Sequence, residues 1–261
     1  LILFPVLLFN NLAYVKFEGS TLTQVLLALV IIIIMSSLTL WMARAFFHIP
    51  VARFGVYVQS QIRFNTYIGL SIMSLLFGAQ GMQMFAMMIA LAIPLVNVIS
   101  VLAFSQGQGL KPRQILFSVI KNPLILGCVV GIIFNLLQLS LFSGLEQLLK
   151  FLASMSLPLG LISVGAALQF AQLKHDYMRL LLNTLGRLIG VPCLAYLICS
   201  MLNLNDFETI ILVVFCSLPT ASAAYILTRY FNGDSQLMAG VISLQTLCFA
   251  FTFPVLMILL N

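Results

Sequence analysis

Two hydrophobic segments of the chain each contain a short polar interruption at a place where a membrane helix would otherwise continue. The first runs from Arg63 to Leu70 and includes an amide, a hydroxyl and a glycine; the second runs from Ser217 to Tyr225 and includes Pro219. A gap in a helix leaves unpaired N–H groups with partial positive charge where the second half-helix begins. Two such ends that cross in the middle of a bilayer would form a binding site for an anion. The alternative is an ordinary proline kink packed by neighbouring helices.

Three cationic residues lie well inside hydrophobic segments: Arg63, Lys121 and Arg187. A charge at such depth costs several kcal/mol unless it faces a cavity or a partner. The sequence has no Asp or Glu at comparable depth, so we expect a carboxylate substrate to supply the missing counter-ion. The alternative is that these long side chains extend to the membrane surface. Arg63 is the strongest candidate because it precedes Asn65 by two residues.

Signatures of enzymes and metal sites are missing from the sequence. The two histidines, His48 and His175, lie at the ends of hydrophobic segments, and there is no glycine-rich phosphate loop. The five cysteines form no C-x-x-C pair, and we interpret them as small apolar core residues. We therefore expect no catalytic activity, no cofactor and no metal.

Composition places most of the chain in a lipid bilayer. Hydrophobic residues make up 62% of the sequence and charged residues 7%, against about a quarter charged in soluble domains. The apolar runs are long and continuous, which favours helices over a barrel. The 12 Lys and Arg residues are scattered singly between these runs, which indicates membrane orientation rather than nucleic-acid binding.

The pattern predicts an all-α integral membrane protein of nine helices. Their expected ranges are 1–15 (partial), 21–43, 53–78, 82–104, 114–138, 144–169, 177–201, 207–230 and 235–260. Basic residues concentrate in alternate connections, which predicts that these connections are cytoplasmic, that Leu1 lies inside and that the C-terminus lies outside.

Proline spacing suggests that the chain contains two related halves. Pro5 precedes Asn65 by 60 residues, and Pro158 precedes Pro219 by 61. The helix at 114–138 has no mate in the first half, so we expect a ten-helix parent whose first helix is absent here. Five helices per repeat give the halves opposite orientations. We therefore predict a first inverted repeat at 1–104, a cytoplasmic linker at 105–113 and a second repeat at 114–261.

Several short motifs, in their order and spacing, resemble the auxin efflux carrier family. They are Phe64 to Leu70, Lys121-Asn122-Pro123-Leu124-Ile125, Leu157 to Leu161 with Gly165, Leu218-Pro219-Thr220-Ala221, Tyr230 with Asp234, and Gln245-Thr246. The resemblance implies two inverted five-helix repeats with two crossing broken helices. It also implies that Asn65 and Pro219 mark the crossing, and that the helices holding Pro5 and Pro158 complete the substrate-binding domain.

The same resemblance extends the set of candidate site residues. The candidate substrate-binding residues are Asn65, Thr66, Gly69, Arg63, Pro219, Thr220, Ser222, Pro158, Gln245 and Thr246, with Lys121, Arg187 and Asn97 as secondary candidates. Polar groups such as Asn97, Asn135 and Asn183 are, taken singly, more often interhelical hydrogen-bonding partners than ligands. The sequence lacks the long loop between halves that plant members of the family have, which favours a multi-pass carrier of the bacterial inner membrane over an auxin exporter.

The leading hypothesis from the sequence is a secondary carrier that moves a small organic anion, such as the dicarboxylates malonate or malate, by alternating access. One alternative is a sodium- or proton-coupled carrier of the antiporter type, which the absence of deep acidic residues disfavours. Another is a membrane receptor or assembly subunit without transport activity. The expected partners are the organic anion, the lipid bilayer and a second copy of the chain, because related carriers often form homodimers; nucleic acid is not expected.

Overall fold

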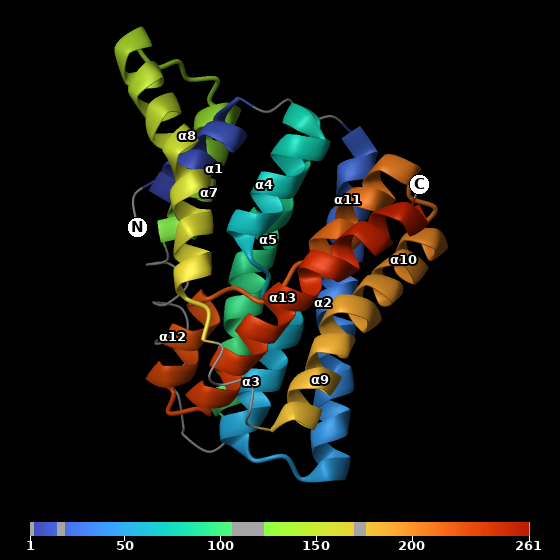
Figure 1. Cartoon of the computed structure of the whole chain (residues 1–261). Helices are drawn as coiled ribbons and strands as arrows, with labels where there is room; N and C mark the ends of the chain where they lie inside the picture. Colours follow the sequence, from blue (N-terminus) through green and yellow to red (C-terminus); the bar gives the residue numbers. More distant parts are fainter. Residues whose placement is uncertain (1–2, 15–18, 106–122, 170–175, 261) are drawn as a thin grey trace.

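The computed structural model describes residues 3–14, 19–105, 123–169 and 176–260. Every regular element in these ranges is helical, and together the helices form a bundle (Figure 1). Five helices or helix stretches in the described residues are long and apolar enough to cross a membrane. The prediction of an all-α membrane protein is therefore confirmed.

The helices follow the predicted order closely. They are α1 (Leu3–Ala13), α2 (Gly19–Phe47), α3 (Val51–Ile62), α4 (Thr66–Leu76), α5 (Gly78–Ser105), α7 (Pro123–Leu136), α8 (Ser143–Ala166), α9 (Tyr177–Leu185), the π-helical turn η2 (Gly186–Gly190), α10 (Val191–Met201), α11 (Asp206–Ser217), α12 (Ala223–Tyr230) and α13 (Ser235–Leu260). The first part of the helix expected at 114–138 lies outside the described residues.

Both predicted breaks are present. The segment expected at 53–78 consists of α3 and α4, and the segment expected at 207–230 consists of α11 and α12. The two broken helices run in opposite directions through the bundle (Figure 1). A long helix precedes and another follows each broken pair, namely α2 and α5 in the first case and α9–α10 and α13 in the second.

Local chemistry explains where the two breaks fall. Leu218 is extended, with φ −59° and ψ 141°, because the ring of Pro219 disfavours the helical conformation in the preceding residue. In the first half the chain leaves the helix at Arg63 (φ −80°, ψ 138°) and resumes after Asn65, whose side chain caps α4. An asparagine at this position stabilises a helix start by satisfying free backbone N–H groups.

One predicted turn is wrong in its extent. The expected helices at 53–78 and 82–104 left a connection at 79–81, but α5 already begins at Gly78, and Gly81 lies inside the helix. Gly78 alone makes the turn, with φ +59°, which glycine adopts without the steric penalty of a side chain.

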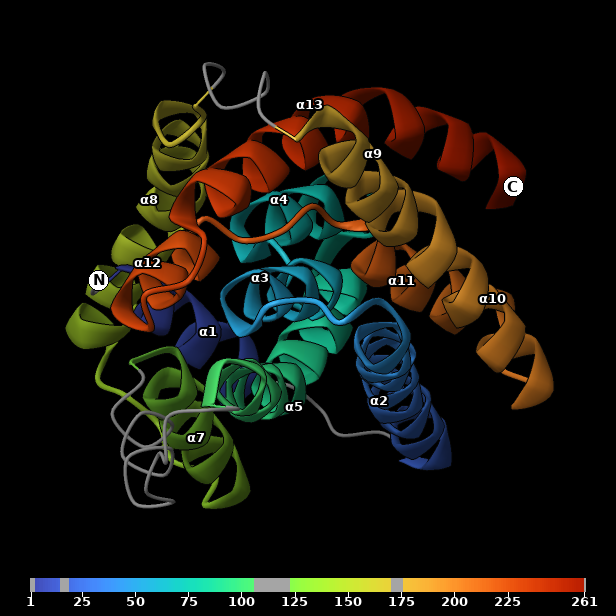
Figure 2. The same ribbon diagram turned by 90° about the horizontal axis from the view of Figure 1, so that it is seen from below.

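The described helices form two groups. α1 makes its most extensive contacts with α7 and α8, while α2, α5, α9–α10 and α13 pack around the two broken helices, α3–α4 and α11–α12. Figure 2 shows α1, α7 and α8 to one side of α3 and α4. The helix that holds Pro5 therefore packs between α7 and the helix that holds Pro158, and Gly127 of α7 lies directly against the backbone of Pro5.

The cysteines are all free. Cys128, Cys199 and Cys216 are buried, in agreement with their interpretation as core residues, and Cys248 is half-buried. Cys193 is exposed on the outer surface of α10, so the interpretation is wrong for this residue.

Candidate functional site

The two breaks touch each other in the centre of the bundle. The backbone N–H of Asn65 donates to the carbonyl oxygen of Pro219 at 2.8 Å. Asn65 is buried, and so is the whole stretch from 211 to 220. The structure thus brings together the two residues that the sequence singled out, and it joins them through the backbone.

The oxygen of the Asn65 side-chain amide is hydrogen-bonded, whereas its nitrogen has no partner among the described residues. Its Oδ1 accepts hydrogen bonds from the N–H groups of Tyr67 and Ile68, both at 3.2 Å. Its Nδ2 is buried and has no hydrogen-bond partner among the described residues. A buried amide N–H without a partner is costly, so this group is a candidate donor for a ligand oxygen.

Arg63 lies at the end of α3 and extends toward α5. Its Nη2 donates to Asn97 Oδ1 at 2.5 Å, and its Nε donates to Ser100 Oγ at 3.3 Å. Both partners are neutral. These bonds therefore fix the position of the guanidinium but do not neutralise its charge.

Arg187 has protein partners that the sequence did not predict. It is 2% exposed, and its Nε donates to the carbonyl oxygen of Leu218 at 2.8 Å. Its Nη1 donates to the carbonyl oxygen of Gln61. The side chain therefore links the last residues of α3 to the break after α11, and it does not reach the membrane surface. Lys121, the third predicted cation, lies outside the described residues.

A network of neutral polar groups surrounds Thr220. Its Oγ1 donates at 2.7 Å to Gln245 Oε1, which also accepts the Thr220 N–H at 2.9 Å. The Oγ1 lies 2.8 Å from the carbonyl oxygen of Ser60 as well. Gln245 Nε2 donates to Asn183 Oδ1, and Asn183 Nδ2 donates to Ser60 Oγ. The network holds α3, α9 and α13 against the second break.

The remaining candidates take less direct positions. Thr66 opens α4, and Ser222 directly precedes α12 without capping it through its side chain. Gly69 packs against Phe85 and Leu218, where a Cβ would come within 2.2 Å of the Phe85 ring. Thr246 bonds to Ile242 of its own helix rather than to the network. Pro158 is exposed in α8, two residues before Gly160, which touches the Tyr67 ring.

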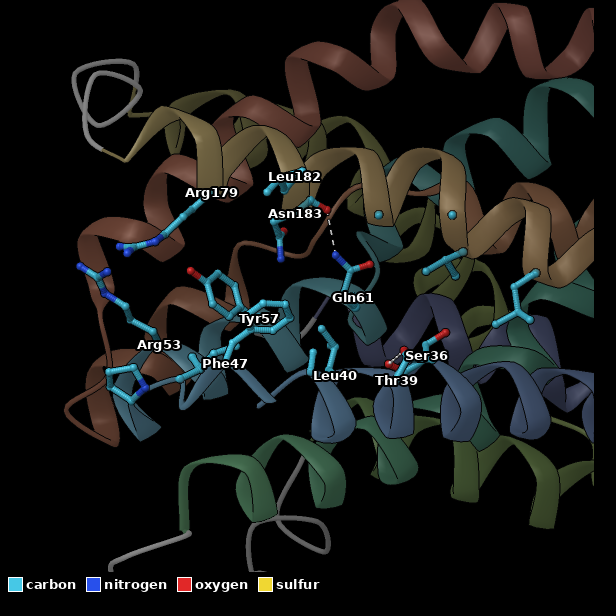
Figure 3. A pocket seen from close by; sticks show the side chains of 17 residues that line it. Ser36, Thr39, Leu40, Phe47, Arg53, Tyr57, Gln61, Arg179, Leu182 and Asn183 are labelled. Carbon is cyan, nitrogen blue, oxygen red and sulfur yellow. Dashed lines mark hydrogen bonds between the residues drawn. The ribbon is translucent and has the colours of Figure 1, made fainter. Parts of the chain in front are cut away.

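A cavity of about 880 Å³ lies beside the crossing, between α2, α3 and the stretch from α9 to α10. Figure 3 shows Arg53 and Arg179 near one end, with Gln61 and Asn183 deeper in the cavity. Gln61 Nε2 donates there to the carbonyl oxygen of Asn183 at 2.8 Å. The volume lies within the range of small-molecule pockets.

Ion pairs cluster where this cavity opens. Arg53 pairs with Asp234 at 3.1 Å and with Asp176 at 3.2 Å, and Arg179 pairs with Asp176 at 3.0 Å. These side chains are a quarter to a half exposed, so each pair contributes little to stability. The cluster connects the first turn of α3 with the chain just before α9 and α13.

Sequence reasoning missed Ser60 and Gln61 as members of the site. The available signal was a run of three polar residues, Gln59-Ser60-Gln61, directly before the first break. Asn183 was recognised as a polar group inside a helix, but its partners could not be identified from the sequence.

Comparisons with known proteins agree with this architecture. The sequence matches the family described as membrane transport protein over residues 1–257. It is also 27% identical over 157 residues to an uncharacterized transporter of Methanocaldococcus jannaschii. That alignment covers 59% of this chain and 49% of the relative, so it spans about half of the relative's length. With its two broken helices in contact and a family match that extends over nearly all of its length, the chain belongs to the membrane transport protein family, that is, the auxin efflux carrier family.

Proposed function

We propose that this protein is a secondary carrier for a small organic anion, with the dicarboxylates malonate and malate as the leading candidates. The observation that carries the proposal is the hydrogen bond between Asn65 and Pro219, flanked by Arg63 and Arg187. It joins the two breaks at the start of α4, where the Asn65 side-chain nitrogen has no partner among the described residues. A cation lies close to each break, Arg63 in the sequence and Arg187 through a hydrogen bond. Fixed donors and positive charge at such a crossing favour an anion.

The distribution of acidic residues supports an anion rather than a cation as the substrate. The acidic residues of the described part lie at or directly before the first turn of a helix: Glu146, Asp176, Asp206, Glu208 and Asp234. Asp176 and Asp234 pair with Arg53 in the first turn of α3. Glu146 pairs with Lys150, and Glu208 belongs to the capping box of α11. This argues against the sodium- or proton-coupled antiporter, in which buried carboxylates usually bind the ion.

The two helix groups supply a simple way to expose the site alternately. α1, α7 and α8 pack with one another and meet the rest along α4 and α5. Relative movement of these groups would open the crossing to one side of the membrane and then to the other. The cavity beside Gln61 would be an access route in one of these states, and its end near Arg53 and Arg179 would face the cytoplasm of a bacterial inner membrane, with the C-terminus outside.

Transport of labelled malonate into proteoliposomes tests the proposal. We expect saturable uptake by the purified protein that unlabelled malate or succinate inhibits and that leucine does not. Liposomes without protein provide the background. Uptake at background level for all small carboxylates would reject the function.

Two other outcomes would favour the alternatives. Labelled sodium flux without any organic anion would indicate a cation carrier. A rise in the melting temperature with malonate, but no flux, would indicate a receptor, because a ligand that binds only the folded state raises its stability even when nothing is transported.

A further inference from the structure

Arg187 occupies an unusual position between the ends of two helices. Its hydrogen bonds within the described residues go to the carbonyl oxygens of Gln61 and Leu218, and none goes to an acidic side chain. Its position in the sequence falls in the π-helical turn η2, between α9 and α10. Such turns are rare and frequently occur at functional sites.

Both carbonyl groups belong to C-terminal helix ends. Gln61 is the residue before the last in α3, and Leu218 is the residue that ends α11. The last four carbonyl groups of a helix have no partner in the helix, and this end bears partial negative charge. The guanidinium therefore joins the negative ends of the two half-helices that precede the breaks.

In carriers with interrupted helices, these carbonyl-rich ends are where coupling sodium ions or protons bind. We propose that Arg187 is a fixed internal cation that takes the place of a coupling cation at this crossing, so that anion transport requires no sodium there. The inference extends the proposed carrier function by assigning its energetic coupling. A guanidinium suits the role because it stays charged at any physiological pH and offers several donors in one plane.

The surroundings of Arg187 fit a permanent charge rather than an exchangeable ion. Ser36, Gln61 and Cys216 line a void of about 10 Å³ next to it, which is about the space of one water molecule. Arg187 Nη2 is buried and has no partner among the described residues. The Nη2 nitrogen therefore remains without a partner in the described part of the chain, while Nε and Nη1 hold the two carbonyl groups.

Melting temperatures of the purified protein in sodium chloride and in N-methyl-D-glucamine chloride test this assignment without any substrate. For the wild type we expect the same melting temperature in both salts. For Arg187→Gln, which removes the charge, we expect a decrease of about 10 °C in the sodium-free salt, part of which sodium restores. Arg187→Lys keeps a charge, so its melting temperature should fall less than that of Arg187→Gln. Sodium should change its melting temperature no more than it changes that of the wild type.

Arg229→Gln is the matched control, because it makes the same chemical change at an exposed residue in the last turn of α12. It should leave the melting temperature and the response to sodium unchanged. A sodium-specific rise in the melting temperature of the wild type would overturn the inference, and so would equal behaviour of Arg187→Gln and Arg187→Lys. The wild-type measurement can overturn the inference even if Arg187→Gln does not fold, and Arg187→Lys then shows whether a charge at this position is enough for folding.

The outcome is separable from that of the proposed function. Malonate uptake that depends on sodium would support the carrier function but reject the proposed role of Arg187. The opposite case is also possible. If malonate is not taken up, the substrate assignment is rejected. If in the same experiments the melting temperature of Arg187→Gln responds to sodium and that of the wild type does not, the role of Arg187 as a fixed cation is still supported.

Discussion

Gly160 of α8 lies directly against the ring of Tyr67 in α4, and a Cβ on Gly160 would be 1.9 Å from Tyr67 Cδ1. Gly160 is also only two residues from Pro158. This is the point where the group of α1, α7 and α8 meets the broken helices. The contact therefore brings the part of α8 that contains Pro158 against the first turn of α4.

Gly160→Ala should impair both stability and transport. The new methyl group forces the Tyr67 ring or helix α8 to move, and overpacking of this kind costs about 1–3 kcal/mol. Unfolding in denaturant and malonate uptake measure the two effects. Gly165→Ala is the matched control, because a Cβ at Gly165 would meet nothing within 4 Å. If Gly160→Ala combined with Tyr67→Ala is as unstable as the sum of the single changes, the two residues do not interact.

Changes at Asn65 should separate helix capping from ligand binding. Asn65→Ala removes the cap of α4 and the free Nδ2, so it should cost about 1 kcal/mol of stability and abolish saturable uptake. Asn65→Asp keeps an oxygen for Tyr67 and Ile68 but replaces the Nδ2 donor with negative charge.

We therefore expect Asn65→Asp to keep the α4 cap, to melt below the wild type because it buries a negative charge, and to be inactive in uptake. Normal uptake kinetics in the folded Asn65→Asp protein would contradict the assignment of Nδ2 to the anion. A large loss of stability without any change in uptake would indicate that capping is the only role of Asn65.

Gln245 and Thr246 are neighbours in sequence but should behave very differently. Gln245→Leu leaves Asn183 Oδ1 and the Thr220 N–H without a buried partner, which should cost about 2–4 kcal/mol because each unpaired group costs about 1–3 kcal/mol. Thr246→Val is the matched control, since Thr246 bonds only to Ile242 of its own helix and such bonds add little stability. Equal losses in the two variants, measured by denaturant unfolding, would show that the network around Thr220 is not stabilising.

Asp234 combines an ion pair with a helix cap, and two substitutions distinguish them. Its Oδ2 pairs with Arg53 at 3.1 Å, and its Oδ1 accepts from the Leu237 N–H at 3.0 Å. Asp234→Asn keeps an oxygen for the cap, so it should cost no more than about 0.5 kcal/mol, because this pair is partly exposed and screened. Asp234→Ala removes both interactions and should cost about 1–2 kcal/mol.

Salt provides the check on the ion pair. Raising the salt concentration should reduce the difference in melting temperature between the wild type and Asp234→Asn, because counter-ions screen an exposed pair. The difference between Asp234→Asn and Asp234→Ala should remain, since it reflects an uncharged cap. A difference between wild type and Asp234→Asn that grows with salt would contradict this account.

Local sequence was a good guide to the helices and to their breaks. Long apolar runs have to be helical in lipid, and Pro219 prevents Leu218 from continuing a helix. Asn65 marks the other break for a similarly local reason, since its side chain can cap the helix that follows. The turn near Gly78 was predicted at about the right place but with too many residues, because polar residues in a sequence do not show how many residues a turn needs.

Partners across the fold were not predictable in the same way. The sequence indicated that Arg63 and Arg187 are buried cations, and it predicted a substrate as their counter-ion. What it could not indicate is that Arg187 donates to two backbone oxygens, one of which belongs to a residue 126 positions away in the chain. Arg63 finds Asn97, a residue that the sequence had ranked below the others.

The sequence by itself thus determined where the backbone must leave the helix and which residues bring charge and hydrogen-bonding groups to those places. These properties depend on a residue and its immediate neighbours in the chain. Only the tertiary structure decided that Asn65 meets Pro219 and that Arg187 joins Gln61 to Leu218. Such contacts depend on which face each helix turns toward its neighbour, and that is determined by the packing of the whole bundle.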